Sequence, residues 1–204
     1  MLSCYVSILG QGRVLLMKQK SETAQAPRAK LAELAVFALF AALMFASRFA
    51  LQGIHGLHPL TLIMAAFTMV WRRRALVLIY LYVAIELITG GFAWAWPYLY
   101  VFLPLWAAVL FWAWLFERRP GLPLPVKVAA LMLTCGMHGL GFGLLYAPAQ
   151  LLMMNVKSWE GILAWWLAGL TFDAVHGAFQ FALGSLALPL AALLGRLRRG
   201  LAKV

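Results

Sequence analysis

The sequence predicts an all-α integral membrane protein, a six-transmembrane-helix bundle with both termini cytoplasmic. Three observations predict this class. The chain is 65% hydrophobic and 11% charged, with a mean hydropathy of +0.89, and a soluble domain of 204 residues could not bury so much apolar surface in one core. The apolar residues form six segments, and the basic residues gather at alternate boundaries between them. The net charge of +11 therefore indicates membrane topology rather than a nucleic-acid partner.

The apolar segments lie between a basic cytoplasmic tail at residues 1–30 and a second basic tail at 196–204, so the bundle occupies 31–195. At ~1.5 Å per residue, roughly 20 helical residues cross a ~30 Å hydrocarbon layer. The first, fourth and fifth segments have this length, and the second and third are short. The last is too long for one span, so we expect an interfacial stretch at 161–171 and a sixth helix at 172–195. The six segments are 31–52, 57–71, 75–92, 97–116, 126–147 and 161–195.

The basic residues fix the expected orientation. All but two of the 17 lie in the two tails, in Arg72–Arg74, and in the turn that carries Arg118, Arg119 and Lys127. Lys157 alone lies on the opposite side, and Arg48 lies within a span. Positive residues favour the cytoplasmic side, so both termini are expected there, whether translation starts at Met1 or at Met17. Cys4 and Cys135 are not expected to form a disulfide.

Ionisable residues inside the predicted spans are the first functional candidates. Each costs ~2.5 to 3.5 kcal/mol in hydrocarbon, so each needs a reason to be there. Arg48, Glu86 and Asp173 fall at the same depth in the outer half of the bundle, and His138 lies nearer the middle of the fifth helix. His176 follows Asp173 by three residues. These five groups are candidates for binding a substrate.

The stretch LTFDAVHGAFQFALG, residues 170–184, carries Asp173, His176 and Gln180 at positions i, i+3 and i+7. This spacing places the three side chains on one helix face, with Gly177 and Gly184 beside them. A stripe so polar is expensive against lipid, so we expect it to face the bundle interior. The glycines then leave room for a neighbouring helix or for a ligand.

Aromatic residues cluster at the predicted outer boundary, in GGFAWAWPYLY (residues 90–100) and in YAPAQLLMMNVKSWEG (residues 146–161). They are typical of an aromatic belt at the headgroup level. With Pro97 and Pro148 stiffening the turns, they equally suit the mouth of a ligand cavity. The candidate binding residues in these two stretches are Trp94, Trp96, Tyr98, Tyr146 and Gln150.

Several other interpretations of the polar residues stay open. A structural network would pair Arg48 with Asp173 or Glu86 and use His176 and Gln180 for interhelical hydrogen bonds. Two His and two carboxylates suit a divalent metal, although only Asp173 and His176 share a helix face and His55 and His58 lie in a loop. Glu86 or His138 suits a proton relay. We expect neither a metal site nor an enzyme, and the alternative function is a small intramembrane enzyme with Asp173 and His176 as acid and base.

The first segment carries a ridge of small residues at every fourth position: Ala38, Ala42, Ala46 and Ala50. Small residues let helices approach closely in lipid, where no hydrophobic force drives their association. The ridge is either an internal packing surface or a docking surface for another membrane subunit. The chain has no phosphate-binding loop, CxxC pair, HExxH pattern or serine elbow, and no inverted repeat of a stand-alone permease.

The chain resembles the substrate-binding S components of energy-coupling factor (ECF) transporters. The resemblance covers residues 31–195 and is carried by the six-helix layout, the AxxxA ridge and the strings ALMFASRFALQGIHGLHPLTLI, WPYLYVF, HGLGFGLLYAPAQ and FDAVHG. It implies a multi-pass protein of a prokaryotic plasma membrane that captures a vitamin or another small cofactor-related metabolite in the outer half of the bundle.

The resemblance also implies partners. Ala38, Ala42 and Ala46 would dock on a membrane coupling subunit, which works with two ABC-type ATPase subunits, so this chain itself needs no cofactor. After docking, the whole bundle would tilt and release its substrate inward. No signature of a thiamine, riboflavin, biotin or folate binder is present, and the residue types suit a small, cyclic metabolite with polar edges and a face that can stack on an aromatic ring.

Overall fold

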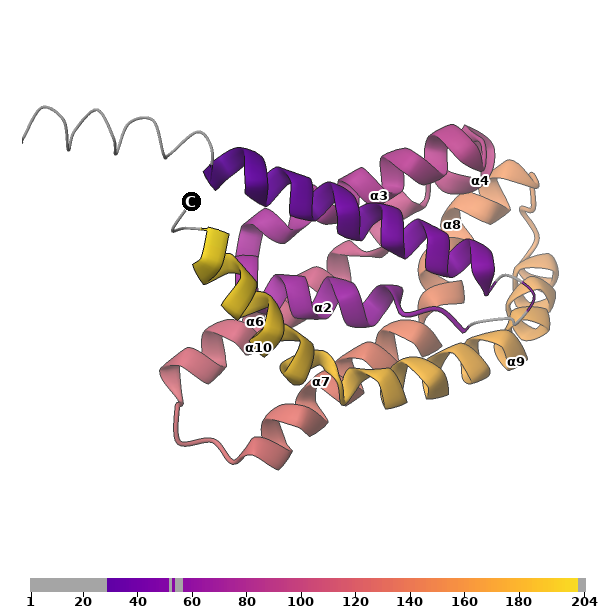
Figure 1. Cartoon of the computed structure of the whole chain (residues 1–204). Helices are drawn as coiled ribbons and strands as arrows, with labels where there is room; N and C mark the ends of the chain where they lie inside the picture. Colours follow the sequence, from indigo (N-terminus) through magenta and orange to yellow (C-terminus); the bar gives the residue numbers. More distant parts are fainter. Residues whose placement is uncertain (1–28, 52, 54–56, 202–204) are drawn as a thin grey trace, which may run out of the picture. The chain divides into compact units, whose positions relative to one another are not determined.

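The computed structural model describes residues 29–51, 53 and 57–201, without the side chains of Ala93 and Trp94 (Figure 1). Every regular element in this part of the chain is a helix, so the predicted all-α class is confirmed. Among the described residues, four helices are long and apolar enough to cross a membrane: Ala29–Ala50, Tyr98–Arg118, Leu124–Met153 and Trp159–Gly184. These helices indicate a membrane protein. The count of six spans and the cytoplasmic position of the termini stay predictions.

After the first helix, Ala29–Ala50, ten elements follow in chain order within the described residues. They are α2 (Leu60–Trp71), η1 (Arg72–Arg74), α3 (Ala75–Thr89), α4 (Phe92–Ala95), α5 (Tyr98–Val101), α6 (Leu103–Arg118), α7 (Leu124–Leu140), α8 (Phe142–Met153), α9 (Trp159–Gly184) and α10 (Ala187–Leu201). Residues 37–195 form one compact unit, and 1–36 belong with 196–204 to a second. The candidate site lies within residues 37–195.

Helix α2 is a core element of that unit. Ten of its 12 residues are buried, and it contacts α3, α6, α7 and α9. A helix that is apolar all round is stable only when it is covered on every side. Its buried hydroxyl residues are Thr61 and Thr68, and the Thr68 hydroxyl donates to the Met64 carbonyl within the helix at 2.7 Å. The shortness of this segment is therefore explained by enclosure within the bundle.

Helices α7 and α9 make the most extensive helix contact within residues 37–195. Glycines permit it, because a Cβ on Gly184 would lie 2.6 Å from the Cα of Met132, and one on Gly177 would lie 2.9 Å from the Leu140 nitrogen. The backbones themselves are in contact. One of the two uses expected for the glycines beside the polar stripe, room for a neighbouring helix, is thus observed.

The expected boundary between residues 171 and 172 is wrong. Helix α9 runs without interruption from Trp159 to Gly184, and the chain breaks instead at Ser185–Leu186 before α10. The Ser158 hydroxyl accepts a hydrogen bond from the Gly161 nitrogen at 3.2 Å, which caps the start of the helix. A prediction from apolarity and length placed the break wrongly, because the start and the end of this helix depend on hydrogen bonds between serine side chains and the backbone.

Two of the predicted spans contain a break that positions the candidate site. The fourth consists of α5 and α6, joined at Phe102, and the fifth consists of α7 and α8, joined at Gly141. Backbone groups near such breaks are available to side chains. The carbonyl of Val101 and the nitrogen of Gly143, one beside each break, both bond to predicted site residues.

Candidate functional site

Arg48, on the first helix, forms an ion pair with Glu86 on α3. The two side chains differ in burial, since Glu86 is 2% exposed and Arg48 is 38% exposed. The partner left open between Glu86 and Asp173 is therefore Glu86. The Arg48 guanidinium also lies 5.6 Å from the centre of the Tyr98 ring, within the range of a cation–π contact.

Tyr82 lies one turn before Glu86 on α3 and is fully buried. Its ring centre is 6.4 Å from that of Tyr98 and 6.0 Å from that of Phe102. Tyr82 is not among the candidate residues that the sequence indicates. The signal that would have found it is its i, i+4 spacing to Glu86, which puts the hydroxyl on the face that carries the buried carboxylate.

The stripe on α9 faces the interior, and Asp173, His176 and Gln180 are all buried. The His176 ring lies 4.8 Å from the ring of His58, and Gln180 Nε2 donates to the His58 carbonyl at 2.9 Å. His58 was expected to be a loop residue, and it does lie just before α2, but its ring belongs to the buried site. His55 lies outside the described residues.

Asp173 serves α8. Its Oδ1 accepts a hydrogen bond from the Gly143 nitrogen at 3.1 Å, in the first turn of that helix. A carboxylate is favoured there, because the first N–H groups of a helix lack backbone partners and carry partial positive charge. Gly143 is required for this contact, since a Cβ there would lie 2.9 Å from the Asp173 Cγ. Asp173 thus positions the segment that carries Phe142 and Tyr146.

His138 on α7 joins the site through the break between α5 and α6. Its Nε2 lies 2.9 Å from the Val101 carbonyl oxygen. A carbonyl only accepts, so this nitrogen carries the proton, and in the neutral ring Nδ1 is then an acceptor. The ring also packs 6.1 Å from Phe102 and 6.2 Å from Phe142.

Aromatic rings connect these groups into one cluster. Phe142 lies 5.6 Å from His176 and 6.4 Å from Tyr98, and Tyr98 lies 6.0 Å from Tyr146. These aromatic rings therefore form a continuous wall from the Arg48–Glu86 pair to His138 and His176. We call these residues the polar cluster: Arg48, His58, Tyr82, Glu86, Tyr98, His138, Phe142, Tyr146, Asp173, His176 and Gln180.

Three predicted site residues lie apart from the polar cluster or outside the described atoms. The described contacts of Trp96 are with Tyr100, at 6.0 Å between ring centres, and with the sulfur of Met153, at 3.3 Å from its Nε1. Gln150 is buried on α8, one turn after Tyr146. The side chain of Trp94 is not among the described atoms. Of the candidate residues in the two aromatic stretches, Tyr98 and Tyr146 therefore belong to the polar cluster.

The polar cluster contains buried hydrogen-bonding atoms that have no partner among the described residues. Such atoms are rare in folded proteins, and each calls for a water, an ion or a ligand. Most of them are acceptors, so they suit a molecule that brings N–H or O–H donors. The cluster atoms are His58 Nδ1, Tyr82 Oη, Glu86 Oε1, His138 Nδ1 and Gln180 Oε1, and Gln150 Oε1 is a sixth nearby on α8.

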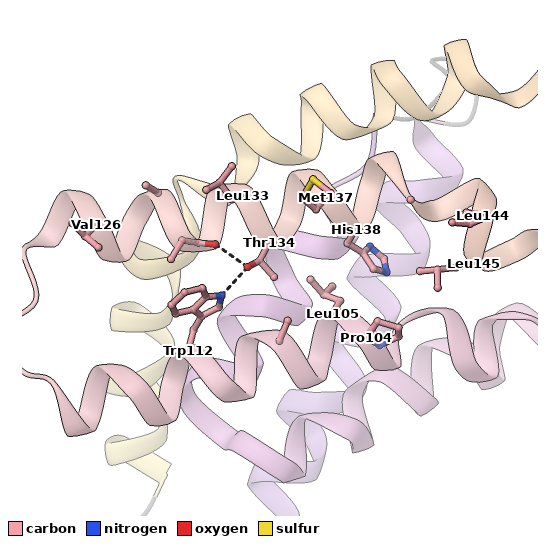
Figure 2. A pocket seen from close by; sticks show the side chains of 14 residues that line it. Pro104, Leu105, Trp112, Val126, Leu133, Thr134, Met137, His138, Leu144 and Leu145 are labelled. Atoms are coloured by element: carbon pink, nitrogen blue, oxygen red, sulfur yellow. Dashed lines mark hydrogen bonds between the residues drawn. The ribbon is translucent and has the colours of Figure 1, made fainter. Parts of the chain in front are cut away.

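An apolar groove borders the cluster on one side. It lies between α6 and α7, has a volume of about 710 Å³, and is lined by side chains such as Leu105, Leu133 and Met137 (Figure 2). Trp112 Nε1 donates to the Thr134 hydroxyl in its wall at 2.9 Å, which satisfies both polar groups. His138 is one of the lining residues, and most of the others are apolar, so the groove suits hydrocarbon rather than a polar metabolite.

The alanine ridge lies on the exposed face of the first helix. Ala38, Ala42, Ala46 and Ala50 are all exposed, whereas Phe37, Ala41 and Met44 turn inward and are buried. Of the two interpretations of the ridge, internal packing within residues 37–195 is therefore wrong. A smooth apolar face is left for lipid or for another protein.

Within residues 29–51, 53 and 57–201, no three His, Cys, Asp or Glu side chains come together as a possible metal site. Comparison with protein families, with curated proteins and with solved structures finds no match. In the part of the chain that the structure describes, the fold and the site define a helical protein with four candidate membrane spans and a buried polar cluster. Its particular function rests on the chemistry of that cluster.

Proposed function

We propose that the protein is the substrate-capture (S) subunit of an ECF-type ABC importer, which binds a vitamin or another small cofactor-related metabolite. The observation that carries the proposal is the polar cluster, with its buried and unpaired hydrogen-bonding atoms. A buried group without a partner costs about 1 to 3 kcal/mol, so a bundle that needed only rigidity would gain by replacing these groups with apolar ones. A ligand that pairs with them removes that cost.

The ligand's chemistry follows from the cluster. Tyr98, Phe142 and Tyr146 offer ring faces, and Glu86 Oε1, His138 Nδ1 and Gln180 Oε1 offer acceptors. A flat metabolite with N–H or O–H groups at its edge would use both. This is the arrangement that small-molecule sites in helical bundles share, an apolar wall with a few placed polar groups.

Coupling to transport would use the exposed alanine ridge. Docking of Ala38, Ala42 and Ala46 on a coupling subunit, driven by two partner ATPases, would precede tilting of the bundle and inward release. The exposure of all three alanines supports this role, because a close helix crossing needs a surface without bulk.

Ligand binding is tested by native mass spectrometry of the detergent-purified chain. We expect a small metabolite to stay bound to the wild type and to the control Tyr80→Phe, because the Tyr80 hydroxyl donates to the Leu99 carbonyl on an exposed part of α3. Tyr82→Phe removes one buried hydroxyl at nearly constant volume and should weaken binding about 10-fold, as expected for a lost hydrogen bond. A wild type that carries no metabolite and shows no thermal stabilisation by any of a panel of vitamins contradicts the proposal.

The docking role is tested separately by affinity purification from native membranes. We expect ABC ATPase subunits and a membrane coupling subunit to co-purify with the wild type and not with Ala42→Trp, Ala46→Trp. The matched control is Ala164→Trp, Ala168→Trp on α9, which adds the same bulk at the same spacing to another exposed face. Equal recovery of the ATPases with both double variants would exclude docking through the ridge.

A further inference from the structure

A second cavity lies away from the polar cluster, between η1 and one face of α6. Its volume is about 600 Å³. Five apolar or aromatic side chains of α6, between Trp106 and Trp114, form its long wall, and Arg72, Arg73 and Glu117 supply its charged groups. Because the lining combines guanidinium groups with a wall of hydrocarbon, it suits a molecule with an anionic end and an apolar chain.

Arg72 is held in place at this cavity. Its Nη2 bonds to Glu117 Oε1 at 2.5 Å, and its carbonyl accepts a hydrogen bond from Trp106 Nε1 at 3.3 Å. Its φ of 56° lies in the left-handed region that a side chain rarely adopts, so these two contacts hold an otherwise unfavourable backbone. Arg72 Nη1 is buried and has no hydrogen-bond partner among the described residues. A fixed donor of this kind requires an acceptor.

The surrounding charge favours an anion. Arg73 and Arg74 follow in η1, and Arg118 and Arg119 follow Glu117 at the end of α6. Among the described residues, Glu117 is the one acidic residue that lines the cavity, and it is already paired with Arg72. The Arg118 guanidinium lies 4.6 Å from the centre of the Trp114 ring, so a cation and an indole meet at the rim, as they do at the headgroup level of membranes.

We propose that this cavity binds one anionic phospholipid, with its phosphate at Arg72 and Arg73 and an acyl chain along α6. Basic pockets between membrane helices recognise lipid headgroups in this way. A free phosphate would make no apolar contact with the wall formed by Trp106, Ala107 and Leu110. An acidic protein segment would leave its polar backbone unpaired in a cavity this apolar. The site is distinct from the polar cluster and does not depend on the proposed transport function.

The test is native mass spectrometry of the full chain, exchanged in detergent against equimolar phosphatidylglycerol and phosphatidylcholine. We expect phosphatidylglycerol to be retained preferentially. Arg72→Gln, Arg73→Gln should lower the ratio of the two bound lipids by about 5-fold for each arginine. The charge-matched control, Arg198→Gln, Arg199→Gln on α10, should keep the wild-type ratio within about 2-fold. An unchanged ratio in the first variant, or an equal fall in the control, overturns the proposal.

A second variant keeps every charge and fills the cavity. Ala107→Trp places an indole against the acyl position, so we expect it to lose bound phosphatidylglycerol while its secondary structure and its elution from a sizing column stay those of the wild type. Retention of the lipid by this variant would place the binding elsewhere and overturn the assignment. So would displacement of the lipid by excess inorganic phosphate, because the headgroup charge alone would then account for binding.

Discussion

At the scale of single residues, the two partners of the Arg48–Glu86 ion pair differ in burial. Glu86 is almost completely enclosed, whereas Arg48 keeps a third or more of its side chain exposed. The cost of breaking the pair therefore depends on which partner is lost. Without Arg48 the Glu86 carboxylate is left charged and desolvated, and without Glu86 the guanidinium can still reach a polar environment.

Removal of Arg48 alone should be more harmful than removal of both residues. Arg48→Leu should lower the free energy of unfolding by about 2 to 3 kcal/mol, because it leaves a buried unpaired carboxylate. Arg48→Leu, Glu86→Leu should be less destabilised, because apolar side chains of similar size replace a buried pair at little cost. Equilibrium unfolding in mixed detergent micelles, followed by tryptophan fluorescence, measures both. Glu86→Leu alone completes the cycle, and losses of the two single variants that add to give the double-variant loss would mean that the pair is not coupled.

The residues of the polar cluster could be predicted in part. Arg48, Glu86, His138, Asp173, His176 and Gln180 stand out because polar groups are expensive in an apolar segment, and the structure buries all of them except Arg48. Their partners could not be predicted, because they depend on tertiary contacts. Asp173 engages a backbone nitrogen 30 residues away, and His58 joins the site because the segment before α2 packs against α9.

At the scale of elements, the close crossing of α7 and α9 depends on glycine. Gly136 and Gly139 on α7 and Gly177 and Gly184 on α9 each lie where a Cβ would come within about 3.0 Å of the other helix. The crossing brings His138 and His176 to the same aromatic residue, Phe142. A longer distance between the helices would therefore open the polar cluster.

Two glycines of α9 provide a matched test of this crossing. Gly177→Ala should destabilise the protein by about 1 to 3 kcal/mol, because its Cβ would meet the backbone of Leu140, which cannot move without shifting α7. Gly169→Ala has no atom within 4 Å of the new Cβ and should be neutral, or stabilising by up to about 1 kcal/mol through helix propensity. Unfolding midpoints measured in the same detergent compare the two. A Gly177→Ala variant as stable as Gly169→Ala would mean that the helices are not in backbone contact.

Periodicity and length predicted the existence of the elements better than their ends. The first segment, expected at 31–52, agrees closely with Ala29–Ala50. The breaks inside the fourth and fifth segments and the two ends of α9 were not predicted, because Phe102 and Gly141 lie within apolar runs and single serines, Ser158 and Ser185, change the hydropathy of a segment little. Hydropathy reports how apolar a segment is, and helix ends are set by individual hydrogen bonds.

At the scale of the whole molecule, the number of crossings is the main open prediction. The four candidate spans do not include α2 and α3, whose 12 and 15 residues are fewer than the roughly 20 that cross a bilayer. Six crossings require that these two helices each traverse the membrane within the bundle. The enclosure of α2 by its neighbours is consistent with this, because a covered helix does not need to match the thickness of the lipid.

The distribution of positive charge makes the topology testable in intact cells. In a background of Cys4→Ser and Cys135→Ala, single cysteines would be placed by Lys157→Cys, Gly121→Cys and Gly200→Cys. All three positions are exposed, and the two glycines have no atom within 4 Å of an added Cβ, so the substitutions should not disturb folding.

With six crossings and both termini inside, a membrane-impermeant maleimide added outside should label Lys157→Cys alone, and all three variants should label after lysis. The physical reason is the positive-inside rule, since Gly121 lies beside Arg118 and Arg119, Gly200 follows Arg198 and Arg199, and Lys157 is the one basic residue predicted outside. Labelling of Gly121→Cys from outside would exclude the arrangement of six crossings with both termini inside. Opposite results for Gly121→Cys and Gly200→Cys would mean an odd number of crossings between them, and hence a different path for α7 to α9.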